Sequence, residues 1–280
     1  MSNSKWALIT GATSGIGKAF AFHFAHEGYN IIATGTRATL LQNTVKELTT
    51  KFDIEATAFV GDLSDVSIQD KLIALGKEKQ AVVLVNNAGF ALNKLFYEAD
   101  LDNWLQMNEL HITCMIRLTY SLLLHMISCN EGTVINVASD AAYMIVQKNA
   151  LYSGTKAYIR QFSQGLYLDL TDTNIYVQAL CPGLTKTDLH EKMGMSKERQ
   201  KNRGILRWEE PEQVVAQSVK AMKKNRAICI SGISTKMLIL FTSQCHLVKT
   251  KRYGNPMPIP LSYTVFVLMH KEYVFQTLVF

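Results

Sequence analysis

Short, unbroken apolar runs alternate along the chain with longer stretches in which apolar residues recur every three or four positions. Continuous runs of this kind are typical of strands that are buried on both faces of a parallel sheet. They occupy residues 6–9, 30–35, 55–60, 81–85, 132–138, 174–180 and 227–231. The alternation predicts an α/β fold, a doubly wound parallel sheet of about seven strands with helices on both faces.

Helices are predicted between these strands, because the apolar positions there fall on one helical face. The expected helices cover residues 40–48, 102–128, 152–171 and 211–224, besides one that carries Phe20 and Phe24. No shift in composition separates these units, so residues 1–235 are interpreted as one domain. Residues 188–210 are polar and basic without a clean apolar period, and we interpret them as a mobile lid over the substrate.

Residues 236–280 are interpreted as an apolar C-terminal extension of the same domain. Its apolar stretches are residues 237–241 and much of 263–280. Neither reaches the roughly 18 to 20 apolar residues that a membrane-spanning helix requires. Packing on its own domain is the favoured interpretation, with a dimer contact or a place on a membrane surface as the alternatives.

Composition and charge exclude several classes of protein. The chain has 280 residues, of which 48% are hydrophobic and 19% charged, and its formal net charge is +6. This modest basic excess comes with no signature of a nucleic-acid-binding module, so no nucleic acid partner is expected. The five cysteines form no CxxC pair, so neither a metal site nor a disulfide is expected, and a reducing cytoplasmic location is favoured. No signal peptide is expected before the first apolar run.

A glycine-rich turn, Thr10–Gly17, joins the first strand to the first helix. Glycines allow the backbone to approach a pyrophosphate closely, and the helix N-terminus offers unpaired N–H donors to it. Strand, turn and helix form the context that a dinucleotide-binding loop requires, although a turn without a ligand could have the same composition. The candidate cofactor-binding residues here are Gly11, Thr13, Ser14, Gly15, Ile16 and Gly17.

The end of the second strand bears on the choice between NAD(H) and NADP(H). Dinucleotide folds often place an acid there that binds the ribose 2′-hydroxyl, and none is present between Asn30 and Val45. Arg37 stands there instead, and a guanidinium suits a 2′-phosphate. NADP(H) is therefore favoured, with NAD(H) as the alternative cofactor and a solvated turn residue as the alternative interpretation of Arg37.

Candidate catalytic residues follow in the second half of the chain. Tyr152 and Lys156 stand four residues apart at the start of a predicted helix, so their side chains share one face. A nearby ammonium lowers the pKa of a tyrosine from about 10 toward neutrality, which makes Tyr152 a candidate proton donor or acceptor. Ser139 directly follows the fifth strand. Asn108 lies inside the long helix, where it is either a surface residue or the mark of an irregularity that reaches the active site.

Together these motifs resemble the short-chain dehydrogenase/reductase family over roughly residues 5–235. The residues that carry the resemblance are Thr10–Gly17, Asp62, Asn86–Gly89, Asn108, Ser139, Tyr152, Lys156, Pro182, Gly183, Thr185 and Thr187. The resemblance implies a Rossmann-type fold and an NAD(P)(H)-dependent carbonyl reductase or alcohol dehydrogenase. Ser14 departs from it, because NADP-preferring members often carry a basic residue there. Residues 231–238 are more similar to the ending of lipid- and acyl-type reductases.

The resemblance also implies a role for each matching residue. Asn108, Ser139, Tyr152 and Lys156 would form a catalytic tetrad. In it Tyr152 exchanges a proton with the substrate oxygen and Ser139 orients that oxygen. Lys156 would lower the pKa of Tyr152 and hold the nicotinamide ribose, while Asn108 positions a water that relays protons. Cofactor contacts are implied for Asp62, Leu63, Asn87, Ala88, Gly89, Tyr152, Lys156, Pro182, Gly183, Thr185 and Thr187.

Substrate and partners are less closely specified. The residues expected near the cleft predict an apolar or acyl-type small-molecule substrate: Phe90, Leu92, Leu95, Tyr143, Met144 and Ile145. The resemblance implies a homodimer or homotetramer in which the helices at 102–128 and 152–171 pair across an interface. The alternative from another functional class is a non-catalytic NADP(H)-binding sensor or scaffold protein, which would not require the acid and base residues.

Overall fold

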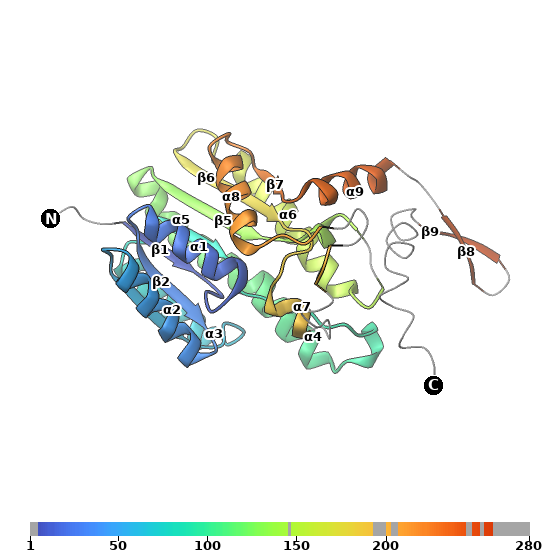
Figure 1. Ribbon diagram of the computed structural model, residues 1–280, viewed down its shortest axis with the longest axis horizontal. Coiled ribbons are helices and arrows are strands. Elements are labelled where there is room, and N and C mark those ends of the chain that lie inside the picture. Colours follow the sequence, from blue (N-terminus) through green and yellow to red (C-terminus); the bar gives the residue numbers. More distant parts are fainter. Residues whose placement is uncertain are drawn as a thin grey trace.

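A seven-stranded parallel sheet forms the centre of the computed structural model, with strand order β3-β2-β1-β4-β5-β6-β7 (Figure 1). The strands are β1 (Trp6–Ile9), β2 (Asn30–Gly35), β3 (Ala56–Val60), β4 (Val83–Asn86), β5 (Gly132–Val137), β6 (Ile175–Cys181) and β7 (Ile228–Ile230). The structure describes residues 5–144, 147–192, 200–202, 207–244, 248–252 and 255–259. The predicted doubly wound parallel sheet is confirmed, and each predicted strand is present with ends within two residues of those expected.

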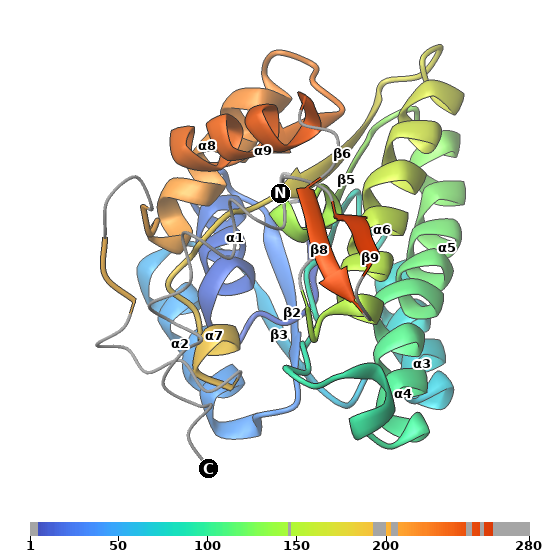
Figure 2. The same ribbon diagram turned by 90° about the vertical axis from the view of Figure 1, so that its right-hand side faces the viewer.

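Helices cover both faces of the sheet, as Figure 2 shows with the sheet between two helical layers. One layer contains α1 (Gly15–His26), α2 (Ala38–Lys51) and α8 (Pro211–Met222), whose apolar faces pack on β1, β2 and β4 in one buried cluster. The other contains α3 (Val66–Glu78), α5 (Cys114–Cys129) and α6 (Ala150–Asp169), which pack on the opposite face. Burial on both faces explains why the strands are continuous apolar runs.

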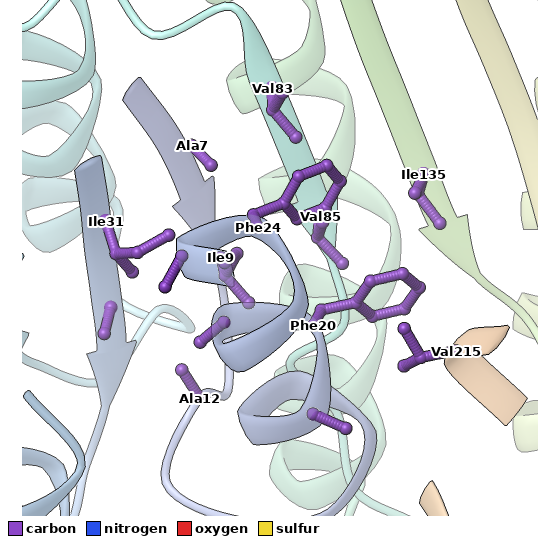
Figure 3. Packing of buried hydrophobic residues seen from close by; sticks show 14 of the residues in the cluster. Ala7, Ile9, Ala12, Phe20, Phe24, Ile31, Val83, Val85, Ile135 and Val215 are labelled. Carbon is purple, nitrogen blue, oxygen red and sulfur yellow. The ribbon is translucent and has the colours of Figure 1, made fainter. Parts of the chain in front are cut away.

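The core between α1 and the sheet is dominated by two phenylalanines (Figure 3). Phe20 is fully buried and Phe24 is 3% exposed, and their rings stack with centres 6.2 Å apart. Val83 and Val85 from β4 and Val215 from α8 complete the packing around them. Replacing such a ring by alanine typically costs about 3–5 kcal/mol of stability. This cluster fixes α1, and with it the glycine-rich turn, against the sheet.

A long helical rod carries the segment in which Asn108 was expected to mark an irregularity. It consists of α4 (Leu101–Asn108), a π-helical turn η2 (Glu109–Thr113) and α5, and it is long and apolar enough to span a bilayer by length and composition. In this fold Leu118 and Leu122 of the rod are buried against the sheet instead. π turns inside α-helices occur frequently at functional sites.

The remaining elements connect the strands or follow the sheet. They are η1 (Phe96–Glu98), η3 (Asp140–Ala142), α7 (Asp188–Lys192), α9 (Ile233–Gln244), β8 (Val248–Arg252) and β9 (Asn255–Ile259). Helix α9 begins shortly before residue 236, where the C-terminal extension was expected to start, and buries Leu238 and Ile239. β8 and β9 pair as an antiparallel hairpin that the sequence pattern did not predict. The apolar stretch 263–280 and residues 193–199 and 203–206 of the expected lid lie outside the described residues.

Candidate active site

The predicted cofactor and catalytic residues gather at the carboxyl edge of the sheet, where the strand order reverses between β1 and β4. Ligands of doubly wound sheets bind at such a reversal. Within the glycine-rich turn, Gly17 approaches the backbone so closely that an added Cβ would lie 2.2 Å from the Gly11 carbonyl oxygen. Gly15 has φ +57°, a left-handed conformation that favours glycine. The turn therefore has the bare, tight backbone that a pyrophosphate needs at a helix N-terminus.

Thr10 joins the glycine-rich turn to the loop after β4. Its hydroxyl donates to the Val85 carbonyl at 3.2 Å and accepts the Asn87 and Ala88 amide protons at 2.8 and 2.9 Å. The Asn87 side chain also donates to the Thr10 carbonyl at 2.9 Å. Two predicted cofactor-binding segments, far apart in the sequence, are thus brought together in one rigid unit.

Asn86 has a structural role between neighbouring elements of the fold. Its side chain donates to Asn136 Oδ1 on β5 at 2.8 Å and to Thr119 Oγ1 on α5 at 3.1 Å. Asn136 in turn donates to Ser163 Oγ at 2.9 Å, and Ser163 donates to the Ile159 carbonyl at 2.7 Å. This buried chain of polar groups is satisfied and holds β4, β5 and α6 in register.

Asp62 and Leu63 lie at the edge of the site, in the turn after β3. The Asp62 side chain is exposed and accepts hydrogen bonds from the Ser64 amide and hydroxyl at 2.9 and 2.8 Å. Leu63 is buried in the core, and its carbonyl accepts a bond from Gln69. Both residues shape the turn, and a contact with adenine stays a prediction.

Arg37 begins the connection from β2 to α2 and points across the glycine-rich turn. Its guanidinium donates to Thr13 Oγ1 at 2.9 Å, to Ser14 Oγ at 2.8 Å and to Asp188 Oδ2 at 2.8 Å. Asp188 is the first residue of α7, so the expected lid segment reaches the place where a 2′-phosphate was predicted. Arg37 is therefore a partly exposed basic group that hydrogen bonds hold over the glycine-rich turn.

The loop after β6 closes the site from the other side. The Pro182 carbonyl accepts the Asp140 amide proton at 2.8 Å, and Thr185 is 2% exposed with its hydroxyl bound to the Gly183 carbonyl at 3.0 Å. A Cβ on Gly15 would come within 2.9 Å of Thr187 Cγ2, so Thr187 lies directly on the glycine-rich turn. The structure thus brings all four predicted positions of this loop to the same edge of the sheet.

Tyr152 lies in the first turn of α6 and is 9% exposed. Burial raises the pKa of Tyr152 to about 12, while a hydrogen bond with Ser139 opposes this rise. Ser139 itself donates to Asp140 Oδ1 at 2.8 Å and caps the short helix η3. Tyr152 is therefore a protonated phenol at neutral pH, in contact with the serine that was expected to orient the substrate oxygen.

Lys156 lies one helical turn after Tyr152 and is 5% exposed. Its ammonium donates to the Val137 carbonyl at 2.9 Å and lies 5.6 Å from the centre of the Tyr152 ring. Burial lowers the pKa of Lys156 to about 8. The sequence predicted that Lys156 lowers the pKa of Tyr152. In the structure burial of the phenol has the largest effect on its pKa, and the Lys156 ammonium is bound to a carbonyl on β5.

The structure does not bring Asn108 to these residues. Asn108 is the last residue of α4, and its side chain is exposed. His111 is 2% exposed in the π turn that follows, and its ring lies against that of Tyr152 with centres 6.0 Å apart. Asn108 is thus a surface residue, the first of its two interpretations. A helix irregularity is also present, but it places His111 against Tyr152. The sequence contained one signal for a buried His111. It falls in phase with the apolar residues that the rod buries: Trp104, Met107, Met115 and Leu118.

Apolar side chains surround Tyr152. Ala91, Trp104 and Met107 form a buried cluster with it, and Phe90, Leu92 and Leu189 pack against that cluster. Of the other predicted cleft residues, Met144 is 2% exposed, and Leu95 and Tyr143 are half-buried. Ile145, the last of the predicted cleft residues, lies outside the described residues.

Comparison with known proteins decides what this arrangement is. The model of the short chain dehydrogenase family matches residues 5–198. This chain belongs to that family. A serine 3-dehydrogenase from Agrobacterium fabrum is 38% identical over 184 residues, which are 65% of this chain and 72% of the relative. As a short-chain dehydrogenase with this fold and these relatives, the protein is an NAD(P)-dependent oxidoreductase that interconverts an alcohol and a carbonyl.

Two further members of the family bear on cofactor and substrate. A very-long-chain 3-oxoacyl-CoA reductase-B from Danio rerio is 32% identical over 195 residues, which are 67% of this chain and 62% of the relative. The structure of L-sorbose reductase from Gluconobacter frateurii, complexed with NADPH and L-sorbose, has a TM-score of 0.72 and 26% identity and covers 81% of this chain and 95% of that one.

Proposed function

We propose that this short-chain dehydrogenase uses NADP(H) and reduces the carbonyl group of an apolar or acyl-type substrate, with Tyr152 as the general acid. The observation that carries the proposal is the position of Tyr152. It is a protonated, buried phenol that contacts Ser139, stands one turn from Lys156 and lies among apolar side chains.

The residues present fit a bound dinucleotide. The Gly11–Gly17 turn would hold the pyrophosphate, and Arg37 with Ser14 would meet a 2′-phosphate. Asn87, Gly89 and the loop from Pro182 to Thr187 would flank the rest of the cofactor, which supplies the hydride when bound. The NADPH in the L-sorbose reductase structure supports this choice, and NAD(H) is the alternative.

Proton delivery falls to residues of this chain. Ser139 would hold the substrate oxygen within reach of Tyr152, whose raised pKa keeps the phenolic proton available for a developing alkoxide. Lys156, still largely charged at neutral pH, would favour the phenolate that forms as this proton leaves. In the oxidative direction the same residues would remove the proton from an alcohol.

The apolar surroundings of Tyr152 support a substrate with an apolar body. Phe90 and Leu92 from the loop after β4 and Leu189 from α7 pack against the buried cluster that contains Tyr152. The name of the Danio rerio relative, a 3-oxoacyl-CoA reductase, is consistent with an acyl-type ketone. The serine 3-dehydrogenase relative is named for a small polar substrate, so a screen must include hydroxy acids.

Two substitutions test the proposal. Titration of NADPH and NADH into the wild type and Arg37→Ala should show tighter NADPH binding that the substitution reduces toward NADH. An NADPH-coupled screen of ketones, 3-oxoacyl thioesters and hydroxy acids should then find turnover that Tyr152→Phe abolishes. If neither nucleotide binds, the proposal is wrong. If NADPH binds but no carbonyl is reduced, the non-catalytic sensor is the better reading.

Assembly and compartment are part of the same proposal. Apolar side chains on α5 and α6 are strongly exposed, which supports pairing of these helices in a homodimer or homotetramer: Tyr120, Leu124, Ile127, Tyr158 and Leu168. Light scattering of the purified chain measures the oligomeric state directly.

Among the described cysteines, Cys114, Cys181 and Cys229 are buried free thiols, which supports the predicted reducing cytoplasm.

A further inference from the structure

His111 is a buried titratable residue to which the proposed chemistry assigns no role. It occupies the middle of the π turn Glu109–Thr113 and is 2% exposed. Burial, together with the charge of Lys156 on α6, holds the pKa of His111 well below its ordinary value. A buried neutral histidine must satisfy one donor and one acceptor nitrogen, so its contacts define what it does.

Both nitrogens of His111 have partners on different elements. The Phe90 amide donates to Nε2 at 3.2 Å, so Nε2 is an acceptor and the proton resides on Nδ1. Nδ1 lies 3.0 Å from the Thr155 hydroxyl oxygen and donates to it. The Thr155 hydroxyl in turn donates to the Tyr152 carbonyl at 2.9 Å. A directed chain therefore runs from the loop after β4, through His111 and Thr155, to the backbone of Tyr152.

Packing contacts hold the ring in the same place. A Cβ on Gly89 would lie 2.7 Å from Nε2, so only glycine allows the loop to approach the imidazole this closely. The ring meets Tyr152 edge to face at 71° and Phe90 at 62°, both with centres 6.0 Å apart. His111 and Lys156 also border one small internal cavity. The imidazole thus touches the phenol ring and supports its main chain.

We propose that His111 is a positioning residue for the reaction. As the neutral Nδ1–H tautomer it binds the Phe90 loop through Nε2, holds the Tyr152 main chain through Thr155, and packs edge to face on the Tyr152 ring. This inference rests on the proposed function of Tyr152. Both ring nitrogens serve as structural hydrogen-bonding groups in this inference, which assigns no proton transfer to His111. Its contribution is the orientation of the phenol, and misplacement of a reacting group by about 1 Å can reduce a rate about 100-fold.

The test compares variants that break each link. Thr155→Val removes the hydroxyl with little change in volume, and His111→Gln retains a polar group near the Phe90 amide but loses Nδ1. Each should lower kcat about 10- to 100-fold while the NADPH dissociation constant stays within about twofold. The double variant should be no slower than the slower single variant, because one chain is broken in either case. Thr155→Ser should recover most of the loss. His125→Gln, on α5 away from the site, is the matched control.

A second measurement does not depend on turnover. Nitrogen-15 NMR of histidine-labelled enzyme should show one histidine that remains the neutral Nδ1–H tautomer at pH 5.5, with a signal that disappears in His111→Gln. A protonated ring or the Nε2–H tautomer would overturn the inference. So would wild-type kcat in both Thr155→Val and His111→Gln, in an enzyme whose turnover requires Tyr152. If NADPH-dependent turnover is absent altogether, the proposed function fails while the NMR result still decides the arrangement of His111.

Discussion

Release of Arg37 from Asp188 should improve the binding of NADPH and leave that of NADH unchanged. In the structure Asp188 Oδ2 accepts a hydrogen bond from Arg37 at 2.8 Å, where a 2′-phosphate would have to bind. The carboxylate and the phosphate therefore compete for one guanidinium. Asp188→Asn keeps the size of the side chain and removes its charge.

The size of the effect follows from the exposure of the pair. The two side chains are 37% and 35% exposed, so water screens their attraction. Pairs of this kind contribute about 0.2–1 kcal/mol, which corresponds to a gain in NADPH affinity of at most about fivefold. Removal of Arg37 itself should weaken the free energy of NADPH binding by more, about 1.5–3 kcal/mol, because charge-assisted hydrogen bonds to the phosphate are lost.

Fluorescence titration of both nucleotides at low and high salt measures these changes. Asp169→Asn, at the end of α6, changes the net charge equally and is the control for long-range electrostatics. The gain in Asp188→Asn should shrink as salt rises, because screening already weakens the ion pair. Weaker NADPH binding in Asp188→Asn, or an equal gain for NADH, would refute the competition and mean that Asp188 helps to bind the cofactor.

Four other outcomes follow from the structure. Tyr152→Phe should lower kcat by about 10²–10⁴ without changing NADPH affinity, since the ring stays packed and only the proton donor is lost. Carbonyl reduction should decline as pH rises past about 8 in a steady-state pH profile, because Lys156 loses its charge there while Tyr152 stays protonated. The folded-state pKa of His111 lies below its unfolded value of about 6.5, so its contribution to stability is complete above that pH and is lost as pH falls. The melting temperature of His111→Gln should accordingly change less between pH 7 and pH 5 than that of the wild type. Gly17→Ala should lower stability by about 1–3 kcal/mol and weaken NADPH binding, whereas Gly165→Ala, whose Cβ would meet nothing within 4 Å, should be neutral or stabilising in thermal unfolding.

The sheet was predictable because burial on both faces leaves a simple pattern in the sequence. β1 and β2 begin and end at the predicted residues, while β7 is shorter than expected, since a strand at the edge of the sheet has a partner on one side only. Tyr152 and Lys156 were predictable for the same kind of reason. Their spacing of one helical turn fixes their relation to each other whatever the rest of the chain does.

Contacts between distant segments were not predictable in this way. His111 falls in phase with the buried residues of the rod, but the helical period alone shows neither the π turn nor the bonds of His111 with Phe90 and Thr155. Likewise, the spacing of Tyr152 and Lys156 does not show that the Lys156 ammonium donates to the Val137 carbonyl on β5. The pairing of Arg37 with Asp188 needed the position of α7, which no local pattern specifies.

The hydrogen bonds of the Thr10 hydroxyl also show which segments of the chain could be exchanged between relatives. The hydroxyl uses its donor and both its acceptor sites on the loop after β4, so the first strand and the fourth form one unit although β2, α2, β3 and α3 intervene. Recombination within α1 and again before β4 would transplant the segment that contains Arg37 and leave this unit intact. A family chimera with those crossovers should fold. A chimera with a single crossover between Thr10 and Val85 would take Thr10 from one parent and its hydrogen-bond partners from the other, and should be less stable.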